Sequence, residues 1–137
     1  MIEHDFSELC ERIKFAEGFR EKPYLCSEGV PTFGYGLTYI TEYEAEWILR
    51  RRVRECVSLV EGYIENEQIS LDDFRIKILS EMAYQLGFKG VLKFKKMWKA
   101  IRDFDYEAAS QEMLNSKWHR QTPTRCEYLA KKMREGV

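Results

Sequence analysis

The first apolar pattern along the chain predicts a short helix that ends at a glycine. Apolar residues recur at intervals of three and four over residues 5–17, as on the buried face of a helix. They are Phe6, Leu9, Cys10, Ile13 and Ala16. Asp5 is a suitable N-cap and Gly18 a suitable left-handed stop. Glu17 is therefore predicted to lie in the last turn, and Phe15 falls outside the apolar face.

The pattern becomes extended over residues 24–37. Pro23 and Pro31 oppose a helix, and Ser27–Gly29 has the composition of a turn. Residues 32–36 then alternate large side chains with glycines, as in a short strand beside a closely approaching backbone. We expect a small β-hairpin here.

The rest of the chain carries helical patterns. A capping box, Thr41 with Glu44, opens a long amphipathic helix predicted over residues 42–63. Ser70 is the expected N-cap of the next helix, which runs up to Gly87 and is predicted to be the central core helix. Shorter helices are expected at about 91–102, at about 106–115, and from Thr122 and Pro123 onward.

Composition is consistent with one folded domain. The chain has 137 residues, of which 45% are apolar and 14% aromatic, and this is enough for a hydrophobic core. One small hairpin among several helices predicts an α+β fold that is mainly α.

The four cysteines show no Cys-x-x-Cys pair and no matching histidine spacing. This argues against a disulfide framework and against a zinc site. We therefore expect reduced thiols, no metal and no cofactor. Cys10, Cys56 and Cys126 are expected to be small apolar residues of the core, whereas Cys26 stands in the predicted hairpin.

Charge is unevenly distributed, although the net charge is only −1. Residues 1–85 contain 10 Lys and Arg against 17 Asp and Glu, whereas residues 86–137 contain 12 against 6. The small net charge argues against a nucleic-acid partner. The basic C-terminal part either steers an anionic polymer or is an unevenly charged solvated surface. The same two interpretations apply to Arg50–Arg52 and Arg54.

The N-terminus has no basic start followed by an apolar run, and no stretch of about 18 apolar residues occurs. We expect no signal peptide and no membrane anchor, and hence a cytoplasmic location after synthesis.

Three polar residues stand at a distinctive spacing in and before the hairpin. Eight residues separate Glu17 from Cys26, and five separate Cys26 from Thr32. This stretch resembles the active-site hairpin of the phage lysozymes of glycoside hydrolase family 24, in which a Glu, an Asp or Cys, and a Thr stand at these intervals. A second block, from Gln85 through Arg125, resembles the C-terminal lobe of the T-even bacteriophage lysozymes.

The resemblance implies a peptidoglycan hydrolase that cleaves between N-acetylmuramic acid and N-acetylglucosamine. Glu17 would protonate the leaving oxygen, because the negative end of a helix disfavours an ionised carboxylate. Cys26 and Thr32 would act on the opposite face of the sugar, where the Thr32 hydroxyl orients a water. The implied substrate-binding residues are Tyr84, Gln85, Arg125 and Thr38. Glu17 is otherwise read as a solvated charge, and Arg125 as a structural ion pair.

Cys26 departs from the many family members that carry Asp at this position. An unperturbed thiol, with a pKa of about 8.5, is only a few per cent ionised at pH 7. Arg20 and Lys22 are close enough in sequence to lower that pKa. The sequence leaves open whether the thiol orients water or attacks the sugar. Met97 and Glu112 also depart from small polar residues of the relatives.

The resemblance further implies two lobes with a cleft between them. The small lobe would cover about 17–41, the interlobe helix about 42–63, and the helical lobe about 64–137 together with helix 5–17. Residues 37–42 are short for the family, which suggests a trimmed small lobe. The implied partner is bacterial peptidoglycan, reached with the help of a holin and without direct contact to it. A monomer is expected, stored in the host cytoplasm until it lyses the host.

Two other classes of function stay open. A non-catalytic wall-binding or structural protein would use the same scaffold without acid chemistry. A cysteine peptidase or amidase would use Cys26 as its nucleophile, with His4 or His119 as the base. Gly34 and Gly36 are not followed by the remainder of a dinucleotide or phosphate motif.

Overall fold

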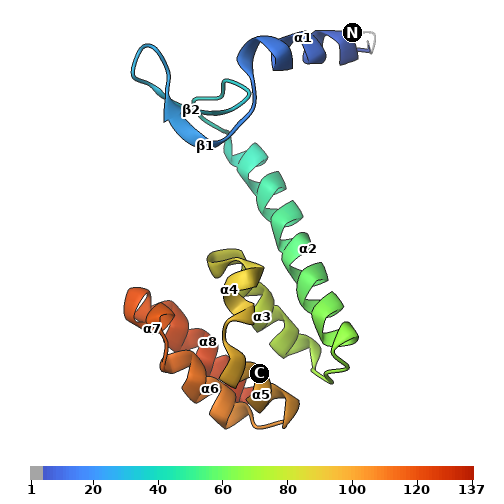
Figure 1. Cartoon of the computed structure of the whole chain (residues 1–137), viewed down its shortest axis with the longest axis vertical. Coiled ribbons are helices and arrows are strands. Elements are labelled where there is room, and N and C mark those ends of the chain that lie inside the picture. Colours follow the sequence, from blue (N-terminus) through green and yellow to red (C-terminus); the bar gives the residue numbers. More distant parts are fainter. Residues whose placement is uncertain (1–4) are drawn as a thin grey trace. The chain divides into compact units, whose positions relative to one another are not determined.

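The computed structural model describes residues 5–137 and divides into two compact units (Figure 1). The hairpin unit ends at Trp47, and the helical unit spans Ile48–Val137. Residues 5–137 form eight helices and one two-stranded sheet, so the predicted mainly helical α+β class is confirmed. The hairpin unit includes α1 (Ser7–Glu17), whereas the predicted helical lobe includes residues 5–17. That lobe assignment stays a prediction.

In the hairpin unit, α1 ends where its sequence predicts. Glu17 is the last helical residue, and Gly18 follows with φ of 70°. The predicted cap is one residue too early, because the N-cap position falls on Phe6. The Asp5 carboxylate nevertheless accepts a hydrogen bond from the Ser7 N–H at 2.9 Å. Both ends of α1 are therefore determined by neighbouring residues, Asp5 at the N-terminus and Gly18 at the C-terminus.

The expectation of a buried apolar face on α1 is wrong in this structure. None of its side chains is buried, and Phe15 is 93% exposed. Thr32 is the buried residue among the described residues of the hairpin unit. A unit of this size encloses too little volume for an apolar core.

The predicted hairpin is confirmed by an antiparallel pair of strands, β1 (Arg20–Leu25) and β2 (Pro31–Gly34). Tyr24 pairs with Thr32 at the end near the turn. Phe33 and Leu37 then form a further bridge that closes a short loop after β2.

The capping box that begins α2 (Glu42–Asn66) is confirmed. The Glu44 carboxylate accepts from the Thr41 N–H at 3.0 Å, and the Thr41 hydroxyl oxygen accepts from the Glu44 N–H at 3.2 Å. The predicted apolar face of this helix is buried only toward its C-terminal end, where Val60 and Ile64 lie in the core.

The helical unit is built around α3 (Asp73–Leu86), as predicted. Leu79 and Met82 of this helix are fully buried. The predicted N-cap, Ser70, is wrong. Asp72 is the cap, because its carboxylate accepts from the Arg75 N–H at 3.1 Å and also pairs with the Arg75 guanidinium at 3.0 Å.

The helix predicted at about 91–102 begins later, as α5 (Lys95–Arg102), and a separate short helix that was not predicted, α4 (Phe88–Leu92), precedes it. At the break, the Val91 carbonyl accepts from the Phe94 N–H at 3.1 Å and from the Trp98 indole N–H at 3.1 Å. The buried indole is therefore a second donor to this carbonyl and ties α5 to the end of α4.

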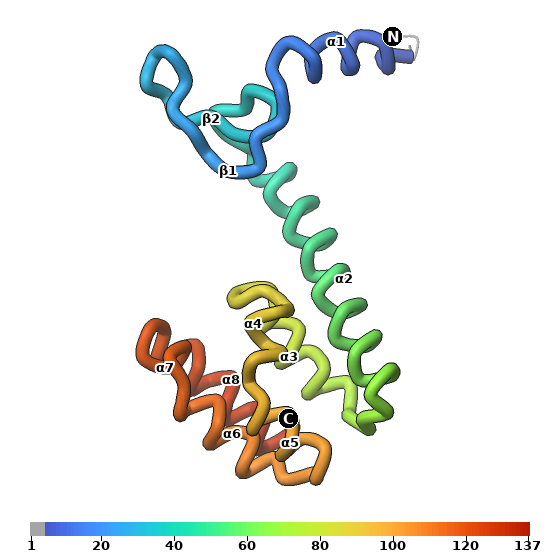
Figure 2. Tube along the Cα trace, in the orientation of Figure 1, coloured from blue at the N-terminus to red at the C-terminus, as the bar shows by residue number. Residues whose placement is uncertain are grey.

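Three more helices complete the unit: α6 (Tyr106–Leu114), α7 (Lys117–Gln121) and α8 (Pro123–Glu135). Helix α6 packs along α8, and α7 joins them (Figure 2). Helix α7 is not predicted by the sequence patterns. It is one short turn, capped by the Ser116 hydroxyl oxygen, which accepts from the His119 N–H at 3.2 Å.

Candidate functional site

Cys26 begins the turn of the hairpin and is held by its backbone. The Cys26 N–H donates to the Val30 carbonyl at 3.0 Å, and the Gly29 N–H donates to the Cys26 carbonyl at 2.9 Å. Gly29 has φ of 76°, a conformation that a glycine adopts without strain. The predicted turn at Ser27–Gly29 is thus confirmed, and it presents a half-exposed thiol.

The environment of the turn lowers the pKa of the Cys26 thiol. The largest cause is a hydrogen bond from the Glu28 backbone N–H, followed by one from the Val30 backbone N–H; the Thr32 side chain adds a smaller contribution. Each of these donors stabilises a thiolate. The suggestion that Arg20 and Lys22 lower this pKa is wrong, because neither is among the causes. The Arg20 guanidinium lies 4.5 Å from the centroid of the Tyr24 ring instead.

Thr32 lies on β2 with only 5% of its surface exposed. Its hydroxyl donates to the Val30 carbonyl at 2.9 Å, and its side chain contributes to the lowered pKa of Cys26. Cys26 and Thr32 therefore form a polar pair in the hairpin.

Glu17 meets a different part of the hairpin unit. A Cβ atom built on Gly36 would clash with Oε2 of Glu17 and would lie 2.7 Å from its Cδ. Gly36 also has φ of 74°. The positive φ favours glycine here, and a larger residue would displace the Glu17 carboxyl group. The Glu17 side chain is exposed, so its position at the helix end is confirmed but the burial considered for an acid is not.

Thr38 lies just beyond the Phe33–Leu37 bridge, in the segment that leads to α2, and is exposed. The hairpin unit thus contains Glu17, Cys26, Thr32 and Thr38. The other three predicted site residues belong to the helical unit.

Tyr84 and Arg125 line one pocket of about 300 Å³ in the helical unit. Apolar side chains from α2, including Val53 and Val57, form its other wall. The Arg125 Nε lies 3.1 Å from Oε2 of Glu81, so the ion pair considered for Arg125 is present. Both side chains of that pair are partly exposed, and Arg125 is accessible from the pocket.

Gln85 is held in a hydrogen-bond network rather than free in a pocket. Its amide nitrogen donates to the Thr122 hydroxyl at 3.1 Å, and its amide oxygen accepts from the Trp118 indole N–H at 3.0 Å. These bonds connect α3 with α7 and with the start of α8. The predicted substrate-binding role of Gln85 stays a prediction, beside a structural role that the sequence does not reveal.

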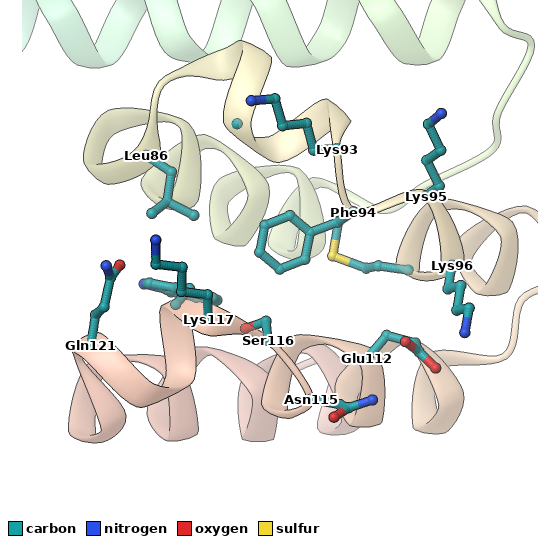
Figure 3. A pocket seen from close by; sticks show the side chains of 13 residues that line it. Leu86, Lys93, Phe94, Lys95, Lys96, Glu112, Asn115, Ser116, Lys117 and Gln121 are labelled. Atoms are coloured by element: carbon teal, nitrogen blue, oxygen red, sulfur yellow. The ribbon is translucent and has the colours of Figure 1, made fainter.

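A second pocket of the helical unit, of about 380 Å³, was not predicted. Figure 3 shows the ring of Phe94 pointing into it and several lysine side chains around it. The lysines are Lys93, Lys95, Lys96 and Lys117. Met97 and Glu112, the two departures from the relatives, also line this pocket, although Met97 is fully buried. The excess of basic residues after residue 85 was the only signal for it.

The two histidines give no support to a cysteine peptidase. His4 lies outside the described residues. The Nε2 atom of His119 lies 3.1 Å from Oε1 of Glu127, within the helical unit. Over residues 5–137 no group of three His, Cys, Asp or Glu side chains could hold a metal ion, and no helix there is long and apolar enough to cross a membrane.

Comparison with known proteins gives a consistent family. The family model described as phage lysozyme matches residues 14–135. The peptidoglycan hydrolase gp36 of Pseudomonas phage phiKMV is 32% identical over 101 residues, which are 73% of this chain and 11% of that protein.

Two proteins of Dictyostelium discoideum are also similar. Probable T4-type lysozyme 1 is 32% identical over 88 residues, which are 63% of this chain and 52% of that protein. Probable T4-type lysozyme 2 is 41% identical over 56 residues, which are 41% of this chain and 33% of that protein. The chain thus spans about half or less of the length of these curated relatives.

Proposed function

The chain belongs to the phage lysozyme family, and on that premise we propose that it hydrolyses bacterial peptidoglycan between N-acetylmuramic acid and N-acetylglucosamine. The family match over residues 14–135 carries this proposal, because it spans Glu17, Cys26 and Thr32. The relatives named as peptidoglycan hydrolase and as probable lysozymes support it.

In the proposed reaction Glu17 acts as the general acid. Its carboxyl group donates a proton to the glycosidic oxygen as the bond from that oxygen to the anomeric carbon breaks. The contact with Gly36 favours this role, because it leaves one side of the carboxyl group against backbone and the other side accessible.

Cys26 and Thr32 act on the attacking water. The Cys26 thiolate accepts a proton from the water as the water oxygen bonds to the anomeric carbon, and the Thr32 hydroxyl orients these groups. The lowered pKa of Cys26 supports this role, because it raises the thiolate fraction near neutral pH. The reaction leaves an ionised Glu17 and a neutral thiol, which exchange protons with solvent before the next turnover.

Product stereochemistry tests the role of Cys26. Attack by water in a single step inverts the anomeric centre, whereas a glycosyl-thiol intermediate retains it. We expect ¹H NMR of a fresh digest of isolated glycan strands to show the inverted anomer first. A retained anomer would make Cys26 a nucleophile and not a base.

The biological setting follows from the same family. We propose that the chain acts as a monomer on the wall of the bacterial host at the end of a phage infection. It would wait in the cytoplasm until a holin opens the inner membrane, with no direct contact to the holin. Tyr84, Arg125, Gln85 and Thr38 would bind the substrate.

A further inference from the structure

An aromatic pair joins the two segments that meet at Glu17. The ring centroids of Phe19 and Tyr35 lie 5.5 Å apart, with an angle of 53° between the ring planes. Phe19 follows Glu17 by two residues, and Tyr35 immediately precedes Gly36. The pair therefore lies beside the contact between the Glu17 carboxyl group and the Gly36 backbone.

Both ends of this pair are fixed by backbone hydrogen bonds. On the side of α1, the Gly18 N–H donates to the Lys14 carbonyl at 2.8 Å and ends the helix. On the other side, the N–H of Phe33 donates to the carbonyl of Leu37, and the N–H of Leu37 donates to the carbonyl of Phe33, each at 2.8 Å. These two bonds close the loop that contains Tyr35.

A cation adds a second connection between the same segments. The Lys14 ammonium lies 5.8 Å from the centroid of the Tyr35 ring, within the range of a cation–π contact. The Glu11 carboxylate lies 3.2 Å from the same ammonium. The Tyr35 ring thus contacts α1 through Lys14 and the segment after α1 through Phe19.

The position of the loop that contains Gly36 affects the position of the Glu17 carboxyl group. Because the Gly36 backbone lies directly against the Glu17 carboxyl group, a shift of the loop relative to α1 changes the space that the carboxyl group can occupy. Among the described residues of the hairpin unit, no apolar side chain is buried that would otherwise fix this spacing. The ring pair is therefore the side-chain contact best placed to set it.

We propose that Phe19 and Tyr35 are positioning residues that hold the Glu17 carboxyl group for proton transfer. This inference rests on the proposed function. Displacement of a catalytic group by about 1 Å lowers turnover up to roughly 100-fold. The position of the carboxyl group affects proton transfer more than the binding of the glycan. Loss of either ring should therefore lower kcat and leave KM nearly unchanged.

The variants are Phe19→Leu and Tyr35→Leu, which remove a ring but keep apolar bulk. Tyr35→Phe keeps the ring and should retain wild-type kcat. Phe15→Leu is the matched control, because Phe15 is an aromatic residue of α1 that is 93% exposed and has no ring contact described. We expect each ring deletion to lower kcat about 10-fold or more on bacterial wall suspensions. The double variant should lose little more than either single one.

A second readout does not depend on activity. The carboxyl carbon of Glu17 is assigned in a ¹³C-labelled sample from the resonance that Glu17→Gln removes. Both ring deletions should shift this resonance, and Phe15→Leu should not. The activity of Glu17→Gln tests the proposed acid role of Glu17 separately. A failure of that role is therefore distinguished from a failure of the positioning role of Phe19 and Tyr35. An unmoved carboxyl resonance, or a loss of kcat no larger than that of Phe15→Leu, would overturn the inference.

Discussion

The hairpin turn, chiefly through its backbone N–H groups, favours the chemistry proposed for Cys26. The four thiols of this chain differ because their surroundings differ. Hydrogen bonds, first from the Glu28 backbone N–H, lower the pKa of Cys26. Burial raises the pKa of Cys56, and it raises the pKa of Cys126 to about 11. The expectation of a core role is confirmed for Cys126, whereas Cys56 is half-buried and Cys10 is exposed.

Selective alkylation follows from this difference. In a Cys10→Ser background, iodoacetamide near pH 7 should modify Cys26 well before Cys56 or Cys126, because the thiolate is the reactive form. Peptide mass spectrometry gives the order, and wall hydrolysis should fall in step with modification of Cys26. Full activity after complete modification of Cys26 would make the thiol a bystander.

The proposed role of Cys26 predicts a rising limb in the pH dependence of turnover. If the thiolate is the working form, activity increases as pH rises through the pKa of the folded protein. The hydrogen bonds of the turn lower that pKa from its ordinary value, so the limb should lie at lower pH than that of an unperturbed thiol. Thr32→Val removes one hydrogen bond that favours the thiolate and should move the limb to higher pH, while Thr32→Ser should leave it in place. An unchanged limb in Thr32→Val would contradict the proposed pair.

Between elements, the close approach of α1 to the loop after β2 requires a glycine. Gly36→Ala would introduce a left-handed alanine, at a cost of about 1–2 kcal/mol, and would push against the Glu17 carboxyl group. Gly87→Ala is the matched control, because φ is 79° there and a Cβ atom would meet open space. We expect both variants to lose similar stability in thermal unfolding, but only Gly36→Ala to lose about 10-fold or more in kcat. Equal kcat in the two variants would contradict a functional contact between Gly36 and the Glu17 carboxyl group.

Arg75 connects α3 with the end of α8. Its guanidinium donates to the Met133 carbonyl at 2.7 Å and lies 3.5 Å from the centroid of the Tyr106 ring. Arg75→Met should lower the free energy of unfolding by about 2–3 kcal/mol, because charged hydrogen bonds are lost and a carbonyl is left unpaired. Arg54→Met, at an exposed position of α2, should change it by less than about 0.5 kcal/mol. Urea unfolding measures the free energy of unfolding of both variants. Equal losses of stability would contradict the connection that Arg75 makes between α3 and α8.

The sequence predicts those elements whose signals are local. The capping box at Thr41 and the turn at Ser27–Gly29 each depend on a few neighbouring residues, and both are confirmed. The break at Phe94 is not predicted, because the Trp98 indole that stabilises it becomes a partner only when the unit packs. Ser70 fails as a cap because Arg75 favours Asp72 by pairing with it.

The same distinction applies to the candidate site. The turn that holds Cys26 is local and is predicted from Ser27–Gly29, whereas the pairing of Cys26 with Thr32 enters only through the family resemblance. The contact between Glu17 and Gly36 joins two elements, and no periodicity reveals it. The network around Gln85 and the lysine-lined pocket depend in the same way on packing between several helices.

Across the whole chain, the proposed catalytic residues and the excess of basic residues lie in different parts of the sequence. The proposed acid and base lie in the hairpin unit, whereas most lysines lie after residue 85. Under the proposed function, the basic region would attract the carboxylates of peptidoglycan, whereas an unevenly charged solvated surface would have no such effect. In the proposed reaction, Glu17 donates the proton that releases the glycan.

Wall hydrolysis by Glu17→Gln tests that claim most directly. Bacterial wall fragments are digested, reduced with borohydride and analysed by mass spectrometry, with Glu21→Gln as a control in an exposed carboxylate of β1. The wild type and Glu21→Gln should produce new N-acetylmuramic acid reducing ends, and Glu17→Gln should do so roughly 100-fold more slowly or not at all. New ends of another kind, or near-normal turnover by Glu17→Gln, would contradict the account.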